Sequence, residues 1–267
     1  MRRIATWSLV AAVLLAFGLT RLPLERSLAS AQQTAHLRSK PLNLGLRDQM
    51  GQLSFAAALS GFRSLVAAFL WIDAHTAWEQ TAWGKMAGLF RTVTALQPHS
   101  LVYWDLSSWH MAWNAAIAAR ENPKEPSEFL RRRAEREYQL LGREFLEQGI
   151  ANNPESYLLH ERLGILLRDK LEDHAGAAAA FSRAAALDGA PPFVKRLAAY
   201  ELAAVKGLER DAYDELRRIY DMGESERLPR VINLLHELEE KLNIPADRRI
   251  PHEPELPHEH PHEHPGE

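Results

Sequence analysis

The spacing of apolar residues predicts helices along almost the whole chain from Leu46 to about residue 243. Apolar residues recur three and four positions apart, which is the period of a helix with one buried face. No stretch alternates apolar and polar residues as a half-buried strand does. Short breaks rich in glycine, asparagine and proline separate the segments, and such breaks join antiparallel neighbours. The pattern therefore predicts an all-α fold of antiparallel helical hairpins.

The first twenty residues have a different pattern. Arg2 and Arg3 precede an uncharged, apolar run over residues 4–20. A run of about 17 residues is short for a membrane span and long for the core of a signal peptide. Ala-Ser-Ala at residues 29–31 imitates a cleavage site but lies far from the run, so an uncleaved signal anchor is favoured over a cleaved peptide. With the arginines in the cytoplasm, a single pass through the inner membrane places the body outside the cytoplasm.

The two ends of the helical region are marked by composition. Proline and glycine punctuate residues 21–45, which are expected to form a linker to a helical domain over residues 46–243. Residues 244–267 are rich in proline, glutamate and histidine, so a disordered tail is expected there. This tail is either a plain solubilising segment or a weak site for zinc, copper or nickel. Its candidate metal ligands are His258, His260, His262 and His264.

A spacing of small and large apolar residues repeats inside the helical domain. The positions are Met86, Phe90, Val93 and Pro98, then Gly142, Leu146, Gly149 and Pro154, then Ala177, Phe181, Ala184 and Gly189, and finally Ala212, Leu216 and Ile219. The small residues allow two helices of a hairpin to approach closely, and the large residue fills the space against the next hairpin.

This spacing resembles the second helix of a tetratricopeptide repeat. Leu163 and Gly164 match the Leu-Gly pair in that family's first helix, and Trp104 and Ser108 match its tryptophan and small positions. The resemblance covers about residues 66–221 and implies a short α-solenoid of three to four hairpins. With its predicted anchor, the whole layout resembles bacterial membrane-anchored tetratricopeptide proteins, which implies a location and a scaffold but no reaction.

In that family the first helix of each hairpin lines a groove that binds a protein partner. Carried over by register, the resemblance implies a groove formed by Trp71, His75, Trp78, Glu79, Asp105, Trp109, Trp113, Arg168 and Asp169. Tryptophan is a favoured binding anchor because it offers a large contact area at low entropic cost. The alternative is that these indoles pack in the core, for example on a helix formed by residues 46–60. Trp104 falls on a packing position and is expected to be structural.

The composition limits the chemistry. The absence of cysteine excludes disulfides, zinc–thiolate sites and cysteine nucleophiles. A net charge of -3 provides no basic surface for nucleic acid. No P-loop, GxSxG or glycine-rich dinucleotide motif is present. His75 and Glu79 share one helix face, but two ligands are too few for a metal site.

The sequence thus favours a non-enzymatic, membrane-anchored scaffold without a cofactor. It would mediate protein–protein interactions, in a bacterial envelope or secretion assembly. The alternative is an envelope metal-handling protein or enzyme that uses the histidine-rich tail or the region of His75 and Glu79.

Overall fold

The computed structural model describes residues 61–251, and every regular element in that range is a helix. The elements are α3 (Arg63–Glu79), α4 (Trp83–Leu96), α5 (Leu101–Trp109), the π-helix η2 (His110–Ala115), α6 (Ala116–Arg120), α7 (Glu128–Asn152), α8 (Tyr157–Asp169), α9 (His174–Ala185), α10 (Pro192–Ala203), α11 (Glu209–Asp221), the 3-10 turn η3 (Glu224–Glu226), α12 (Pro229–Lys241) and the 3-10 turn η4 (Ala246–Arg248). The prediction of an all-helical fold is confirmed for these residues.

Several predicted features lie outside the described residues. They are the anchor over residues 1–20, the linker over 21–45, the helix over 46–60 and the four tail histidines. Between residues 61 and 251, no helix combines the length and the apolar character needed to cross a membrane.

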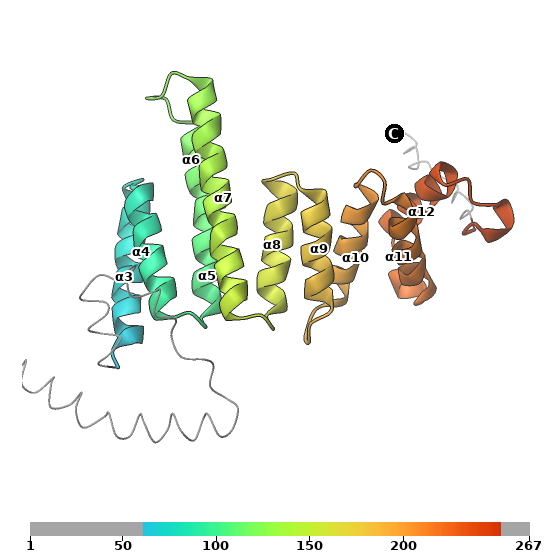
Figure 1. Ribbon diagram of the computed structural model, residues 1–267, viewed down its shortest axis with the longest axis horizontal. Coiled ribbons are helices and arrows are strands. Elements are labelled where there is room, and N and C mark those ends of the chain that lie inside the picture. The colour runs from blue at the N-terminus through green and yellow to red at the C-terminus, as the bar shows by residue number, and fades with distance from the viewer. Residues whose placement is uncertain (1–60, 252–267) are drawn as a thin grey trace, which may run out of the picture.

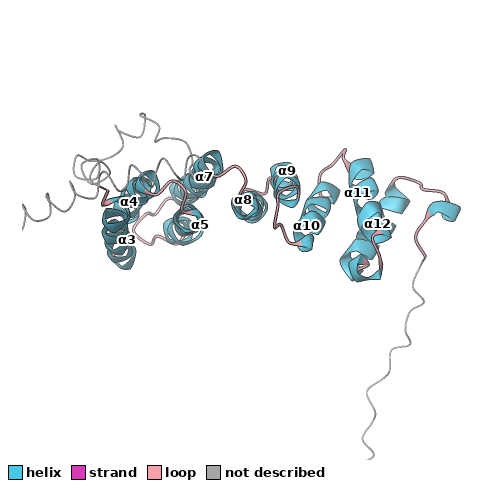
Figure 2. Cartoon of the chain, turned by 90° about the horizontal axis from the view of Figure 1, so that it is seen from below, coloured by secondary structure: helices cyan, strands magenta, loops and turns pink. Residues whose placement is uncertain are grey.

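The helices stand side by side in a row along the longest axis of the molecule (Figure 1). Each packs mainly on its neighbours in the chain, most closely α3 on α4, α8 on α9 and α9 on α10. Seen along the helices, the row has two layers (Figure 2). We call the side formed by α3, α5, α8 and α10 layer A, and the side formed by α4, α7, α9 and α11 layer B.

The core lies between the two layers. The largest fully buried side chains include Phe90, Phe145 and Phe181, one each from α4, α7 and α9. One core cluster runs from α3 to α10, and a second, which contains Leu216 and Leu235, joins α10, α11 and α12. All the repeat positions that lie within helices, from Met86 to Ile219, are buried, whereas Pro154 and Gly189 in the loops are exposed.

Glycine at two contact points lets the layers approach closely. A methyl group on Gly164 of α8 would lie 2.6 Å from the Phe181 ring of α9. A methyl group on Gly149 of α7 would lie 2.8 Å from the Trp104 ring of α5. Both contacts are shorter than carbon atoms tolerate, so these glycines are required by packing rather than by backbone conformation.

The packed domain continues beyond the boundary expected from composition. Ile244 and Ile250 both lie in the second core cluster. The backbone N–H of Ile250 donates a hydrogen bond of 2.8 Å to the carboxylate of Glu239, which is itself fully buried. Burial of the two isoleucines and the hydrogen bond to Glu239 thus hold the chain against α12 as far as Ile250.

The cap of α9 provides a test of local stability. The Asp173 carboxylate accepts a hydrogen bond of 2.8 Å from the backbone N–H of Gly176 and so caps the helix. We expect Asp173→Ala to lower the free energy of unfolding by about 1 kcal/mol, because that donor loses its partner. Urea unfolding measures the change, and Asp188→Ala, in the loop after α9, serves as the control. Equal losses in both variants would contradict the assignment.

Candidate functional site

A hollow of about 500 Å³ opens in layer A between α5–η2 and α8. It is lined by Asp105, Leu106, Ser108, Trp109, Trp113, Leu146, Arg162, Ile165 and Asp169. All but Leu146 come from the layer A side of the row, so the hollow is open to the surface of that layer. Its size suits one or two side chains of a bound segment.

The apolar walls of this hollow come from helices of unequal pitch. Trp109 ends α5, and Trp113 lies in the π-helix that follows. A π-helix places one extra residue in each turn, and such segments occur often at functional sites. Trp109 is 45% exposed and Leu106 is 36% exposed. The hollow therefore presents apolar surface to solvent.

The polar rim consists of two ion pairs. Arg162 approaches Asp105 at 3.4 Å, and the Arg168 guanidinium donates to Asp169 at 2.6 Å. The Nζ atom of Lys170 lies 5.2 Å from the centroid of the Trp113 ring. Each carboxylate at the rim is paired with an arginine. The hollow is therefore amphipathic, with both charge signs available at its edge.

An aromatic bridge connects this hollow to α3. The centroid of the His110 ring lies 5.1 Å from that of Trp109 and 6.1 Å from that of Trp78 on α3. Trp78 in turn stacks on His75 at 5.3 Å. Trp78 is 37% exposed, so exposed indoles from two neighbouring layer A helices share one surface. We call Trp78, Trp109, Trp113 and His110 the aromatic surface.

Burial lowers the pKa of His110, and the nearby His75 lowers it further. Asn114 lies 3.0 Å from Nδ1 of His110, which fits a neutral ring accepting the amide N–H. A neutral imidazole keeps the aromatic surface free of a buried charge at neutral pH.

This lowered pKa predicts how stability depends on pH. The unfolded chain binds a proton at His110 more readily than the folded chain, so acidification from pH 7 to pH 5 removes stability. We expect His110→Phe to weaken this dependence while keeping an aromatic ring in place. His160, whose pKa is also lowered, chiefly by burial, retains part of the slope. Urea unfolding at both pH values checks this; identical slopes in both proteins would contradict it.

The hollow and its bridge bring together most of the residues that the sequence placed in a groove. Asp105, Trp109, Trp113 and Asp169 line the hollow, and Trp78 joins them through His110. The other two residues on that part of α3, His75 and Glu79, form an exposed pair at 3.6 Å.

Two of the expected groove residues lie differently. Trp71 is partly buried, and its ring lies 5.0 Å from both Phe90 and Tyr103, so it packs α3 on its neighbours instead of facing a ligand. Arg168 orients Asp169 and approaches the Phe181 ring but does not line the hollow. Trp104 is buried, as expected, and its Nε1–H donates to the Pro98 carbonyl at 2.8 Å.

The sequence-based prediction missed Leu106, Ser108, Leu146 and Arg162 in the lining of the hollow, and His110 beside it. His110 directly follows the predicted groove residue Trp109, and the packing of the helices places both His110 and Arg162 at this surface. Leu106 follows Asp105 in the same way. The sequence shows only that Leu106 lies in a tryptophan-rich stretch, and its exposure is known from the structure. Nothing in the residue spacing marks the π-helix that contains His110.

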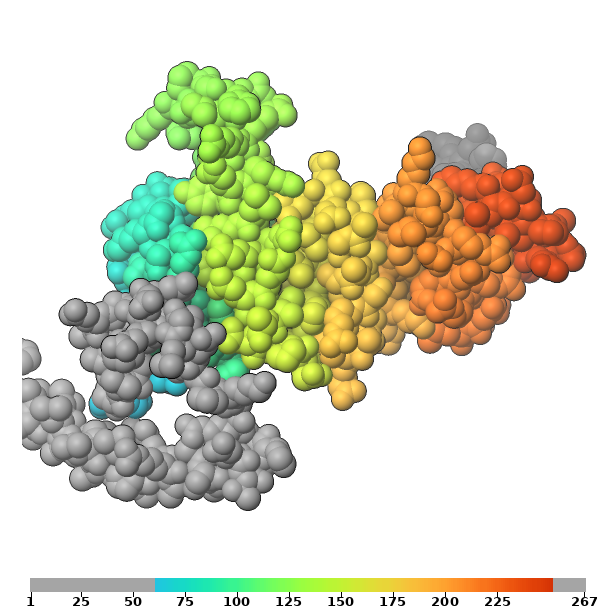
Figure 3. Space-filling view, in the orientation of Figure 1, coloured from blue at the N-terminus to red at the C-terminus, as the bar shows by residue number. Residues whose placement is uncertain are grey.

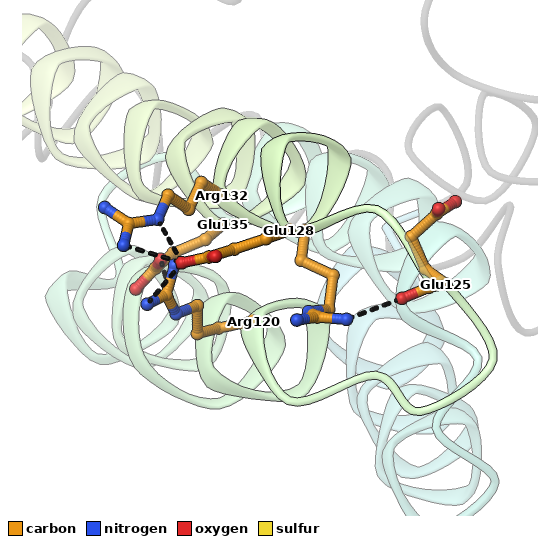
Figure 4. Close-up of polar contacts among 6 residues, drawn as sticks. Arg120, Glu125, Glu128, Arg132 and Glu135 are labelled. Carbon is orange, nitrogen blue, oxygen red and sulfur yellow. Dashed lines mark hydrogen bonds and ion pairs between the residues drawn. The ribbon is translucent and has the colours of Figure 1, made fainter.

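A second polar cluster, at the ends of α6 and α7, is formed by ion pairs within the chain. The ends of α6 and α7 project beyond the row (Figure 3). There Arg132 donates to Glu128 at 2.7 Å, and Arg120 lies 3.8 Å from Glu128 and 3.9 Å from Glu135 (Figure 4). Arg133, next to Arg132 on α7, is likewise paired with Glu137 at 2.9 Å, and such exposed pairs fit a solvated helix face. Within the described range, no three histidine, aspartate or glutamate residues converge as metal ligands do.

Comparison with known proteins adds no assignment, since no family model, no curated protein and no solved structure matches the chain.

Proposed function

We propose that the chain is a non-enzymatic scaffold that binds a segment of another protein on the surface of layer A. The observation that carries this proposal is the aromatic surface beside the hollow, where Trp78 and Trp109 remain substantially exposed. Buried tryptophans need no ligand, whereas exposed ones beside an open hollow are typical of binding anchors. The hollow would accept an apolar side chain, and the two ion pairs at its rim would meet polar groups of the same segment.

The repeat architecture proposed from the sequence supports the same function. Helices paired in chain order and arranged in two layers suit a tetratricopeptide-like α-solenoid, in which one layer offers a continuous surface. The predicted anchor would hold this surface at the inner membrane, with the body outside the cytoplasm. A partner in an envelope or secretion assembly would then be within reach.

Site-specific photocrosslinking tests the proposal. A benzophenone amino acid is placed at Leu106 in the hollow and, in a second protein, at Leu140 on α7. Both side chains are similarly exposed, at 36% and 43%. In intact membranes we expect position 106 to crosslink a defined protein that position 140 does not reach. No product at either position, or the same products at both, would overturn the proposal. The crosslinked partner segment supplies the peptide for later measurements.

A further inference from the structure

A second hollow lies where the hairpin of α6 and α7 extends past the turn between α8 and α9 (Figure 1). Its volume is about 330 Å³, near the small end of the range for ligand pockets. We call it the basic hollow, because four of its seven lining residues are cationic and two are anionic. The lining residues are Arg120, Arg132, Glu135, Arg136, Gln139, Lys170 and Glu172.

Gln139 is the first sign that the basic hollow holds a ligand. This residue is only 8% exposed, and its side-chain amide has no hydrogen-bond partner among residues 61–251. In that range the unpartnered side-chain atoms that are sealed from solvent belong to Ser107 and Ser108, so the Gln139 amide is not sealed. Its polar atoms therefore reach the hollow that the residue lines. A nearly buried amide in this position bonds to whatever occupies the hollow.

Two cations of the basic hollow are the second sign. Neither the Arg136 guanidinium nor the Lys170 ammonium forms an ion pair with a carboxylate of the described residues. By contrast, Arg132, Arg133 and Arg143 on the same helix as Arg136 each pair with a glutamate one turn away. The unpaired positive charge is thus concentrated at the hollow.

The donors reach the basic hollow from three elements. Arg132, Arg136 and Gln139 are spaced by four and three residues, so they share one face of α7. Arg120, the last residue of α6, extends toward Arg132 (Figure 4). Lys170 comes from the turn that follows α8. A ligand in the hollow would therefore meet N–H groups on several sides at once.

We propose that the basic hollow binds a phosphate dianion, either free or at the end of a small phosphate monoester. A guanidinium donates two parallel hydrogen bonds to a phosphate group, and an ammonium and an amide each add another. A phosphate group offers three oxygens to donors on different sides, whereas a carboxylate offers two. The two cations without a carboxylate partner match its two negative charges. No apolar residue among those described lines the hollow, so the rest of the ligand is small and polar.

The two glutamates of the basic hollow determine the sign of a mutational test. Glu135 lies 3.9 Å from Arg120, which compensates its charge. Glu172 forms no ion pair within residues 61–251, and its charge repels an anion in the hollow. Removing the charge of Glu172 should therefore strengthen phosphate binding, and removing that of Arg136 should weaken it.

The basic hollow and the aromatic surface are neighbours that differ in chemistry. The Nζ atom of Lys170 lies 5.2 Å from the centroid of the Trp113 ring, so Lys170 forms the border between them. The aromatic surface offers indole rings, and the basic hollow offers only polar groups. Phosphate binding does not depend on partner binding and goes beyond the proposed function.

Phosphate titration of the full chain in detergent micelles tests the proposal. Sodium phosphate replaces sodium chloride at constant ionic strength and about pH 8, where phosphate is a dianion. Proton–nitrogen NMR follows the Gln139 side-chain amide, which is identified by its absence in Gln139→Leu. We expect this signal to shift and saturate, with affinity lowered at least about tenfold by Arg136→Gln and raised about threefold by Glu172→Gln. A parallel titration with glycerol phosphate distinguishes the two sources, because the natural form should bind more tightly.

Arg143→Gln is the matched control, because it removes the same charge from the same helix. Arg143 pairs with Glu147 at 2.7 Å and does not line the basic hollow, so its loss should change phosphate affinity less than about twofold. Equal losses in the Arg136 and Arg143 variants, or no saturable shift of the Gln139 signal, would overturn the proposal. Thermal unfolding checks that each variant is folded. No partner is needed, so failure here and failure of partner binding are distinguishable.

Discussion

Replacing Gly142 with alanine is expected to lower the free energy of unfolding by about 2–3 kcal/mol. Gly142 lies where α7 crosses the junction of α5 and η2. A methyl group there would lie 2.6 Å from Cβ of Ala112 and 2.8 Å from the backbone carbonyl oxygen of Ser108. Because one of these atoms belongs to the backbone, no side-chain rotation relieves the contact, and the two helices must move apart.

The matched control for this substitution is Gly88→Ala. Gly88 lies in the middle of α4, and a methyl group added to it meets no atom within 4 Å. Alanine there should leave stability unchanged or raise it by up to about 1 kcal/mol, since glycine is a poor helix former. Urea unfolding of the full chain measures both variants. Equal stability of the Gly142 variant and wild type would contradict the described crossing of α7 over η2.

Trp109→Ala is expected to weaken binding of the crosslinked partner peptide by at least about 30-fold, or about 2 kcal/mol. The indole forms a wall of the hollow and contacts the aromatic bridge through His110. Since nearly half of its surface is already in solvent, its loss should change stability little. Fluorescence anisotropy of the labelled peptide measures affinity, and thermal unfolding checks the fold.

Phe129→Ala is the control for loss of exposed aromatic surface. Phe129 is more exposed than Trp109 and lies in the first turn of α7, a layer B helix. Its removal should leave peptide affinity unchanged. If both substitutions reduced affinity equally, or if neither did, the aromatic surface would not be the binding site.

The burial pattern could be read from the sequence because it follows from local spacing. Gly142, Phe181 and Ala184 fall on positions where the repeated pattern places small or large apolar residues, and all three are buried. Close helix packing allows few residue types at such positions, so their spacing carries the information. The breaks at glycine and proline likewise marked helix ends, because proline cannot continue a helix and glycine, as at Gly189 and Gly223, adopts positive φ at low cost.

The candidate site could be predicted only in part, because tertiary packing decides which members of a stripe are exposed. Trp71 and Trp78 share one face of α3, yet Trp71 packs on Phe90 while Trp78 stays exposed. The difference arises because α4 and α5 lie against the part of that face that carries Trp71, through Phe90 and Tyr103. His110 begins the π-helix η2 and contacts Trp78 of α3, and helical spacing of 3.6 residues does not describe the register of that segment.

The indole N–H signals of the tryptophans test the central claim most directly. A proton–nitrogen NMR spectrum of the full chain is recorded with and without the partner peptide. The account predicts that the Trp78, Trp109 and Trp113 signals shift on binding. The Trp104 signal should stay in place, because that indole is buried and its Nε1–H donates a hydrogen bond to the Pro98 carbonyl. Shifts confined to tryptophans outside the aromatic surface, with Trp78, Trp109 and Trp113 unchanged, would contradict the assignment of layer A as the binding surface.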